Sequence, residues 1–164
     1  MWQPDPTTIR SDQKMSPSSP PKSAHRRYLP WLIALFSLFV FRVVAQLLQS
    51  VYPVSFLPSY SAWHSGALPY GSLVLSQLLI IMVFSLTIRG FARESVRPKR
   101  RLGQWLLVLG GFYFGTMILR LLAGLTIAAD HPWFGAKIPA FFHIVLASFI
   151  LLVGHFHLKQ SDET

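Results

Sequence analysis

The chain contains no cysteine among its 164 residues. Disulfide bonds, thiolate chemistry, and metal sites or clusters held by cysteine are therefore excluded. Charge is also scarce, because only 13% of the residues are charged and only six are acidic. A soluble domain needs more charge than this to keep its surface in water. An ordinary soluble globular protein is therefore disfavoured.

Hydrophobic residues are abundant instead: they make up 52% of the chain and cluster in long runs. Such runs are typical of a protein whose solvent is lipid. The formal charge of +9 is compatible with nucleic-acid binding. However, the basic residues stand next to the hydrophobic runs and accompany no nucleic-acid-binding motif. We therefore expect the lipid bilayer, and not nucleic acid, to surround the protein.

Four hydrophobic segments are long enough to cross a bilayer, which takes about 20 residues. Since a backbone in lipid must satisfy its own hydrogen bonds, each segment is predicted to be a helix. Residues 1–27 are rich in proline, serine and charge and are predicted to be a disordered tail. The sequence thus predicts an all-α integral membrane protein, with a four-helix bundle over residues 28–158 and a short tail over 159–164. The transmembrane helices are expected at about 29–51, 70–91, 103–129 and 138–158.

The basic residues predict the orientation of this bundle. The first span follows Arg26 and Arg27, and the connection between the second and third spans holds five lysines and arginines. The other two connections contain only Lys137. Because cytoplasmic loops carry the excess of lysine and arginine, both termini are expected in the cytoplasm. We predict a multi-pass protein of the cytoplasmic (inner) membrane, whose other two connections face outward.

The two halves of the sequence resemble each other. The run RVVA from Arg42 matches RLLA from Arg120, and each half continues with a Gly-Ala pair and a proline. LVLSQLLI at 73–80 also resembles IVLASFIL at 144–151. We predict an internal repeat of two tandem helical hairpins, related by a pseudo-two-fold axis along the membrane normal.

Each half also places one arginine inside a hydrophobic span. Arg42 and Arg120 each lie nine residues before the predicted outer end of their span. At about 1.5 Å per residue, both are roughly 13 Å below the outer surface. Placing an arginine near mid-bilayer costs about 2.5–3.5 kcal/mol of free energy on insertion scales. Each of the two arginines is therefore predicted to belong to a functional site. Only one acidic residue, Asp130, is expected on the outer side to neutralise the two.

Uncharged polar side chains fall at a similar depth. Gln46 follows Arg42 by four residues and therefore shares its helix face. Gln77 and His143 lie roughly 10 and 7 Å inside their own spans. The two arginine faces continue through Gln49 on the first span and through Tyr113, Thr116 and Gly124 on the third.

These positions predict a ligand site formed by Arg42, Gln46, Gln77, Arg120 and His143. We expect it to be an outer-facing polar pocket that takes an anionic or quinone-like amphiphile. Two other interpretations stay open. The arginines could be satisfied by backbone carbonyls and glutamines, or they could face a membrane-protein partner that supplies the missing carboxylates.

The histidines favour neither haem nor a metal. A bis-histidine haem needs facing histidines on different spans, and His143 alone lies clearly within a span. His64, Asp130 and His131 lie in the outer connections without a recognised ligand spacing. No carboxylate pair or Ser–His–Asp arrangement indicates catalysis. We therefore name no cofactor and favour a protein that is not an enzyme.

The leading prediction is a small polytopic membrane protein that binds the amphiphile, alone or as an accessory subunit of a larger membrane complex. One alternative is a small transporter or lipid-handling protein, and another is a membrane enzyme that uses the outer histidines. A second copy of the chain is a further candidate partner. Gly110, Gly111 and Gly115 in LGGFYFG predict close helix packing, within the bundle or between copies.

Overall fold

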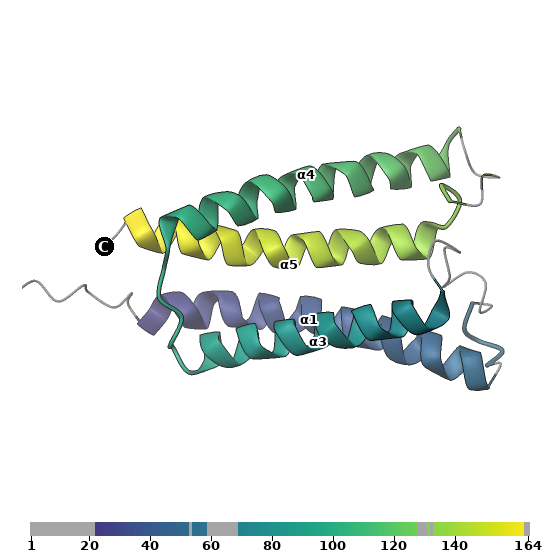
Figure 1. Ribbon diagram of the computed structural model, residues 1–164, viewed down its shortest axis with the longest axis horizontal. Coiled ribbons are helices and arrows are strands. Elements are labelled where there is room, and N and C mark those ends of the chain that lie inside the picture. The colour runs from purple at the N-terminus through teal and green to yellow at the C-terminus, as the bar shows by residue number, and fades with distance from the viewer. Residues whose placement is uncertain (1–21, 53, 59–68, 128–130, 132, 163–164) are drawn as a thin grey trace, which may run out of the picture.

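A computed structural model describes residues 22–52, 54–58, 69–127, 131 and 133–162. The described chain consists of helices and short connections and contains no strand. The predicted all-α fold with four membrane-spanning helices is confirmed. The helices are α1 (Lys22–Val51), α3 (Tyr70–Ala92), α4 (Arg100–Leu125) and α5 (Lys137–Asp162), which lie side by side in Figure 1.

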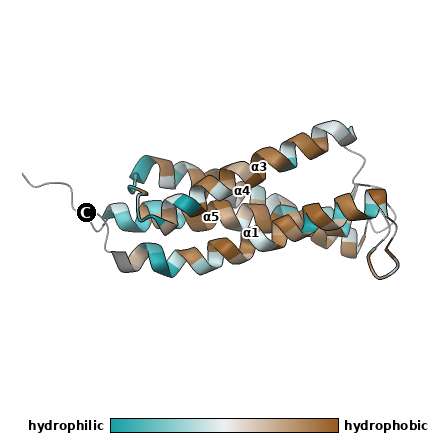
Figure 2. Cartoon of the chain, turned by 90° about the horizontal axis from the view of Figure 1, so that it is seen from below, coloured by the Kyte–Doolittle hydropathy of each residue, from teal (hydrophilic) through white to brown (hydrophobic). Residues whose placement is uncertain are grey.

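Each helix is long and apolar enough to cross a bilayer. The shortest, α3, has 23 residues, which span about 35 Å at about 1.5 Å per residue. Large apolar side chains such as Phe112 and Leu75 are 79% and 70% exposed, which suits a surface in contact with lipid. Figure 2 shows hydrophobic residues along the middle of the helices and hydrophilic residues gathered where α3 is connected to α4.

The first residue of α1, the last of α5 and the connection 93–99 lie at one end of the bundle (Figure 1). We call this the basic end, because Arg93, Arg97, Lys99, Arg100 and Arg101 gather there. The opposite end, where α1 ends and α5 begins, is called the loop end.

The helix α3 lies beside α1 and also meets α5 through side chains, since the Phe84 ring stacks on Phe149 with centroids 3.6 Å apart. The helix α4 packs closely along α5, and α1 contacts both α3 and α5. Over their described residues, α3 and α4 do not pack against each other, although they are adjacent in sequence. The bundle is therefore open between α3 and α4.

Glycines allow the close approach of α4 to α5. A Cβ atom at Gly103 would lie 2.7 Å from the backbone nitrogen of Leu158, and one at Gly110 would lie 3.1 Å from a methyl group of Ile150. The packing predicted for Gly110 is thus confirmed within the bundle. Gly111 and Gly115 differ, because open space surrounds their Cβ positions. Packing against a second copy stays a prediction.

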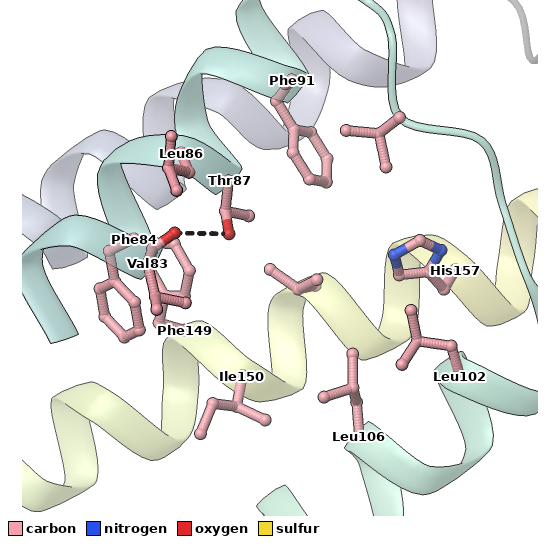
Figure 3. Close-up of a pocket in the computed structure, with 13 residues that line it drawn as sticks. Val83, Phe84, Leu86, Thr87, Phe91, Leu102, Leu106, Phe149, Ile150 and His157 are labelled. Atoms are coloured by element: carbon pink, nitrogen blue, oxygen red, sulfur yellow. Dashed lines mark hydrogen bonds between the residues drawn. The ribbon is translucent and has the colours of Figure 1, made fainter. Parts of the chain in front are cut away.

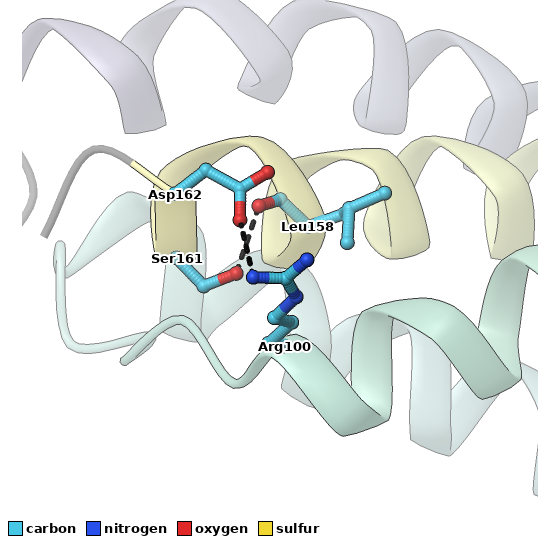
Figure 4. Close-up of polar contacts among 4 residues, drawn as sticks. All are labelled: Arg100, Leu158, Ser161 and Asp162. Carbon is cyan, nitrogen blue, oxygen red and sulfur yellow. Dashed lines mark hydrogen bonds and ion pairs between the residues drawn. The ribbon is translucent and has the colours of Figure 1, made fainter.

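A surface ion pair joins the two helices at the basic end. The Arg100 guanidinium lies 3.4 Å from the Asp162 carboxylate (Figure 4). The neighbouring Ser161 hydroxyl donates to the Leu158 carbonyl, about one turn back along α5. Both charged side chains are more than half exposed, so the pair adds little stability. It marks where the end of α5 lies beside the start of α4.

The N-terminal tail prediction is wrong in one part, because α1 already begins at Lys22. The cause is tertiary packing by His25, which is only 1% exposed. Its Nε2 atom lies 3.1 Å from the Val96 carbonyl oxygen, and its ring packs against Phe91 and Phe156. These contacts hold residues 22–27 in a helix. The rest of the predicted tail, residues 1–21, lies outside the described residues.

Other helix boundaries also differ from the predicted spans. The helix α5 continues to Asp162, through most of the predicted C-terminal tail, because Gln160 is buried in the bundle. The helix α4 runs from Arg100 to Leu125, three residues earlier at its start and four at its end than predicted. The earlier end brings Arg120 closer to the loop end than the sequence indicates.

The two predicted hairpins are present, but their packing is unequal. A two-fold axis that exchanges the hairpins would pair α1 with α5 and, equally, α4 with α3. The described residues show the first of these contacts and not the second. The internal repeat therefore stays a prediction from sequence.

Candidate functional site

The predicted site residues lie together in the half of the bundle toward the loop end. Arg42, Gln46, Gln77 and Arg120 are between 1% and 6% exposed, and His143 is half-buried. They come from all four helices, so the site exists only once the bundle has folded. With Tyr113, which lies among them, these residues are called the arginine cluster: Arg42, Gln46, Gln77, Tyr113, Arg120 and His143.

A pair of glutamines forms the α1–α3 side of the cluster. The Gln77 Nε2 group donates a 3.0 Å hydrogen bond to Gln46 Oε1, and both side chains are buried. The Gln46 Nε2 group is buried without a hydrogen-bond partner in the described structure. The hydrogen bond thus joins the Gln77 amide nitrogen to the Gln46 amide oxygen, and the Gln46 amide nitrogen remains unused as a donor.

A tyrosine and a histidine form the α4–α5 side. The Tyr113 hydroxyl oxygen lies 2.6 Å from His143 Nδ1. When the hydroxyl donates to Nδ1, the ring proton of the neutral imidazole must sit on Nε2. The sequence places Tyr113 on the Arg120 face, but the predicted site does not contain it. The signal was its spacing of seven residues from Arg120, which is two helical turns.

Arg120 is held by the connection between α4 and α5. Its Nη2 group donates a 2.8 Å hydrogen bond to the Trp133 carbonyl, and its guanidinium carbon lies 4.1 Å from the centre of the Trp133 ring. Gly124 permits this arrangement, because a Cβ atom there would overlap the Phe134 carbonyl. With α4 ending at Leu125, Arg120 lies five residues from the helix end, or roughly 8 Å. It is shallower than the 13 Å expected from the sequence.

Arg42 has fewer polar contacts than Arg120. Its guanidinium carbon lies 5.5 Å from the centre of the Phe142 ring, at a distance where a cation and an aromatic face attract. Its Nε group is buried without a hydrogen-bond partner among the described residues, and the same holds for Nε of Arg120. Two permanent cations therefore reach the cluster with buried donors unused.

The electrostatic balance of the cluster is positive. The charges of Arg42 and Arg120 both act on the His143 ring, so all three groups share one field. The described acidic residues, Glu94 and Asp162, form their ion pairs at the basic end. No carboxylate of the described chain therefore neutralises the arginines. Asp130, the acid predicted for the outer side, lies outside the described residues.

The predicted metal candidates gain no support. His64 and Asp130 lie outside the described residues, and His131 has a different role. Its Nδ1 atom accepts hydrogen bonds from the backbone N–H groups of Trp133 and Phe134, at 3.2 and 3.5 Å. It thereby stabilises the turn that carries the Trp133 carbonyl to Arg120. Within the described ranges, no three histidines, cysteines or acids lie close enough to hold a metal.

Comparisons with models of protein families, with curated proteins and with solved structures give no match to this chain. The case for a function therefore depends on the chemistry of the arginine cluster.

Proposed function

We propose that this protein binds an anionic or carbonyl-bearing amphiphile in the arginine cluster, within a cytoplasmic membrane and with the loop end facing outward. The observation that carries the proposal is the state of the two arginines. Both are buried at membrane depth, both keep a buried N–H group without a partner, and no described carboxylate accompanies them. An acceptor-rich ligand supplies what they lack.

The number of unused donors supports a ligand with several oxygens. A guanidinium carries five N–H donors. Arg120 donates one hydrogen bond to a described residue, at Trp133, and Arg42 donates none. A buried donor without an acceptor costs about 1–3 kcal/mol, and more when it is charged. A phosphate, a carboxylate or a pair of carbonyl oxygens would remove this cost through charge-assisted hydrogen bonds.

The uncharged members of the cluster also present donors. The free Nε2 group of Gln46 is one, and Gln77 holds the amide in place from the other side. His143 is the second when the Tyr113 hydroxyl donates to Nδ1, because the ring proton then sits on Nε2. Two cations and several unused donors favour an acceptor-rich ligand over a cationic one.

The aromatic contacts prepare the site before the ligand arrives. Phe142 and Trp133 each lie against one guanidinium, and the turn capped by His131 holds Trp133 in place. Side chains already fixed by packing lose less conformational freedom on binding. The same geometry also fits a membrane-protein partner that inserts a carboxylate, and the experiment below separates the two occupants.

The test compares the purified full-length protein with Arg42→Gln/Arg120→Gln by native mass spectrometry after gentle extraction. A small molecule of constant mass should be retained by the wild type and reduced at least tenfold in the double variant. Arg27→Gln/Arg89→Gln is the matched control, because it removes the same charge from exposed positions. This control should retain the molecule.

Two results would contradict the proposal. One is a folded double variant that carries the same small molecules as the wild type. The other is a wild type that carries a second protein, absent from the double variant, and no small molecule. The second result would assign the arginines to a protein interface.

A further inference from the structure

A hollow lies in the other half of the bundle, between α3 and α4, and shares no residue with the arginine cluster. Its volume is about 340 Å³. Side chains from α3, α4 and α5 face into it, as Figure 3 shows for Phe91, Leu106 and Ile150. We call it the lateral groove, and its lining residues are Val83, Phe84, Leu86, Thr87, Gly90, Phe91, Val96, Leu102, Leu106, Phe149, Ile150, Val153 and His157.

The groove follows from the helix packing. Gly103 and Gly154 bring α4 onto α5, since a Cβ atom at either would lie within 3.0 Å of the facing helix. The connection from α3 bends away at Glu94, whose φ angle is 53°, and carries Val96 against Gly90. As a result, α4 is separated from α3. The helix α4 packs along α5, and α3 meets α5 through side chains such as Phe84 and Phe149.

The lining has almost no free polar group. The Thr87 hydroxyl donates to the Val83 carbonyl at 2.9 Å, as Figure 3 shows. His157 Nδ1 accepts a 3.2 Å hydrogen bond from the Lys99 backbone N–H. These are the only two side chains in the lining with hydrogen-bonding groups. Thr87 uses its hydroxyl within α3, and His157 keeps one ring nitrogen, Nε2, among otherwise apolar side chains, so the groove favours a mainly apolar occupant.

The end of the groove at His157 is strongly basic. The residue bonded to His157, Lys99, belongs to the basic connection, and Arg97, Arg100 and Arg101 beside it are exposed. Clusters of lysine and arginine next to a membrane span attract anionic lipids. The groove thus combines an apolar interior at membrane depth with a cationic end.

We propose that the lateral groove binds one acyl chain of an anionic phospholipid, whose headgroup lies against Arg97–Arg101. The size agrees with this occupant. An apolar cavity of about 150 Å³ holds a benzene molecule, so about 340 Å³ takes a longer segment of hydrocarbon. A single helical turn, about 10 Å across and about 5.4 Å high, takes up roughly 420 Å³ and is too large for it. The charge of the connection selects an anionic headgroup.

The test uses nanodiscs of phosphatidylcholine that contain a small fraction of phosphatidylglycerol with a photoreactive diazirine in its acyl chain. After illumination, the sites of attachment on the full-length protein are mapped by mass spectrometry. Attachment to the lining of the groove should exceed attachment to exposed side chains such as Leu75 and Leu79 at least fivefold. Excess unlabelled phosphatidylglycerol should reduce it, and excess phosphatidylcholine should not.

Filling the groove tests its volume. Val153→Trp places an indole in the lining and should lower attachment there at least fivefold. Leu102→Trp does the same from a position that is 43% exposed, so it is tolerated even if Val153→Trp does not fold. Val108→Trp, on the exposed face of α4, is the matched control and should attach as the wild type does.

Arg97→Gln/Arg101→Gln tests the headgroup and should remove the advantage of phosphatidylglycerol over phosphatidylcholine. Attachment spread evenly over all exposed helix faces would overturn the proposal. Equal competition by the two lipids would overturn the choice of an anionic headgroup. Neither result bears on the arginine cluster, because Arg42 and Arg120 stay intact in every variant.

Discussion

The Tyr113 hydroxyl and the His143 ring form a 2.6 Å contact that joins α4 to α5 beside the two buried arginines. The contact occupies Nδ1 of the imidazole and leaves Nε2 as the other ring nitrogen. When the hydroxyl donates to Nδ1, the proton of the neutral imidazole sits on Nε2, which can then donate to a ligand. Tyr113 is therefore a positioning residue for the proposed ligand.

Tyr113→Phe should weaken retention of the ligand by about three- to tenfold, since one hydrogen bond contributes about 0.5–1.5 kcal/mol. The phenylalanine keeps the ring but no longer orients His143. Retention can be measured by native mass spectrometry during stepwise dilution. Phe112→Leu changes the neighbouring residue, which is 79% exposed, and should have no effect. Unchanged retention in Tyr113→Phe would remove the hydroxyl from the binding mechanism.

Substitutions in the pair Gln46 and Gln77 should affect the stability of the protein and its ligand binding differently. Gln77→Leu leaves Gln46 Oε1 buried without its 3.0 Å donor and should lower the free energy of unfolding by about 1–3 kcal/mol. Gln46→Leu/Gln77→Leu removes both partners and should recover most of that loss, because an apolar pair needs no hydrogen bond. Thermal unfolding in detergent measures both variants.

Ligand retention should not recover in Gln46→Leu/Gln77→Leu, although stability does. The double variant lacks the free Nε2 donor of Gln46 and should bind weakly although it is stable. A double variant that binds as the wild type does would show that the pair serves packing alone. A double variant less stable than Gln77→Leu would show that the buried amides stabilise the fold in a way that leucines cannot.

Much of this architecture could be predicted from local sequence patterns. Hydrophobic runs fix the four spans, and an arginine inside such a run is visible without a structure. The i, i+4 spacing placed Gln46 beside Arg42, and both are buried. These features depend on the neighbours of a residue in sequence, and a single sequence reports them directly.

Contacts between helices could not be predicted in the same way. The start of α1 at Lys22 depends on His25 meeting Val96, which is 71 residues away. The lateral groove depends on Gly103 approaching Leu158. The Trp133 carbonyl reaches Arg120 because α4 ends early, at Leu125. Each of these contacts reflects the choice of packing partner, which hydropathy does not encode.

Gly124 offers a test of how the loop end supports Arg120. Gly124→Ala places a methyl group on the Phe134 carbonyl, so the turn must move and the Trp133 carbonyl must leave the Arg120 guanidinium. We expect a loss of about 1–3 kcal/mol of stability, typical of overpacking at a tight contact, together with weaker ligand retention.

Gly115→Ala is the matched control on the same helix, because open space surrounds its Cβ position. Alanine should be neutral there or stabilise the protein by up to about 1 kcal/mol, through its higher helix propensity. Thermal unfolding and native mass spectrometry on the two variants give both quantities. If Gly124→Ala matches Gly115→Ala in stability and retention, the turn does not hold Arg120. If Gly115→Ala is instead the destabilising change, its open face is occupied in the native assembly, as the predicted contact with a second copy requires.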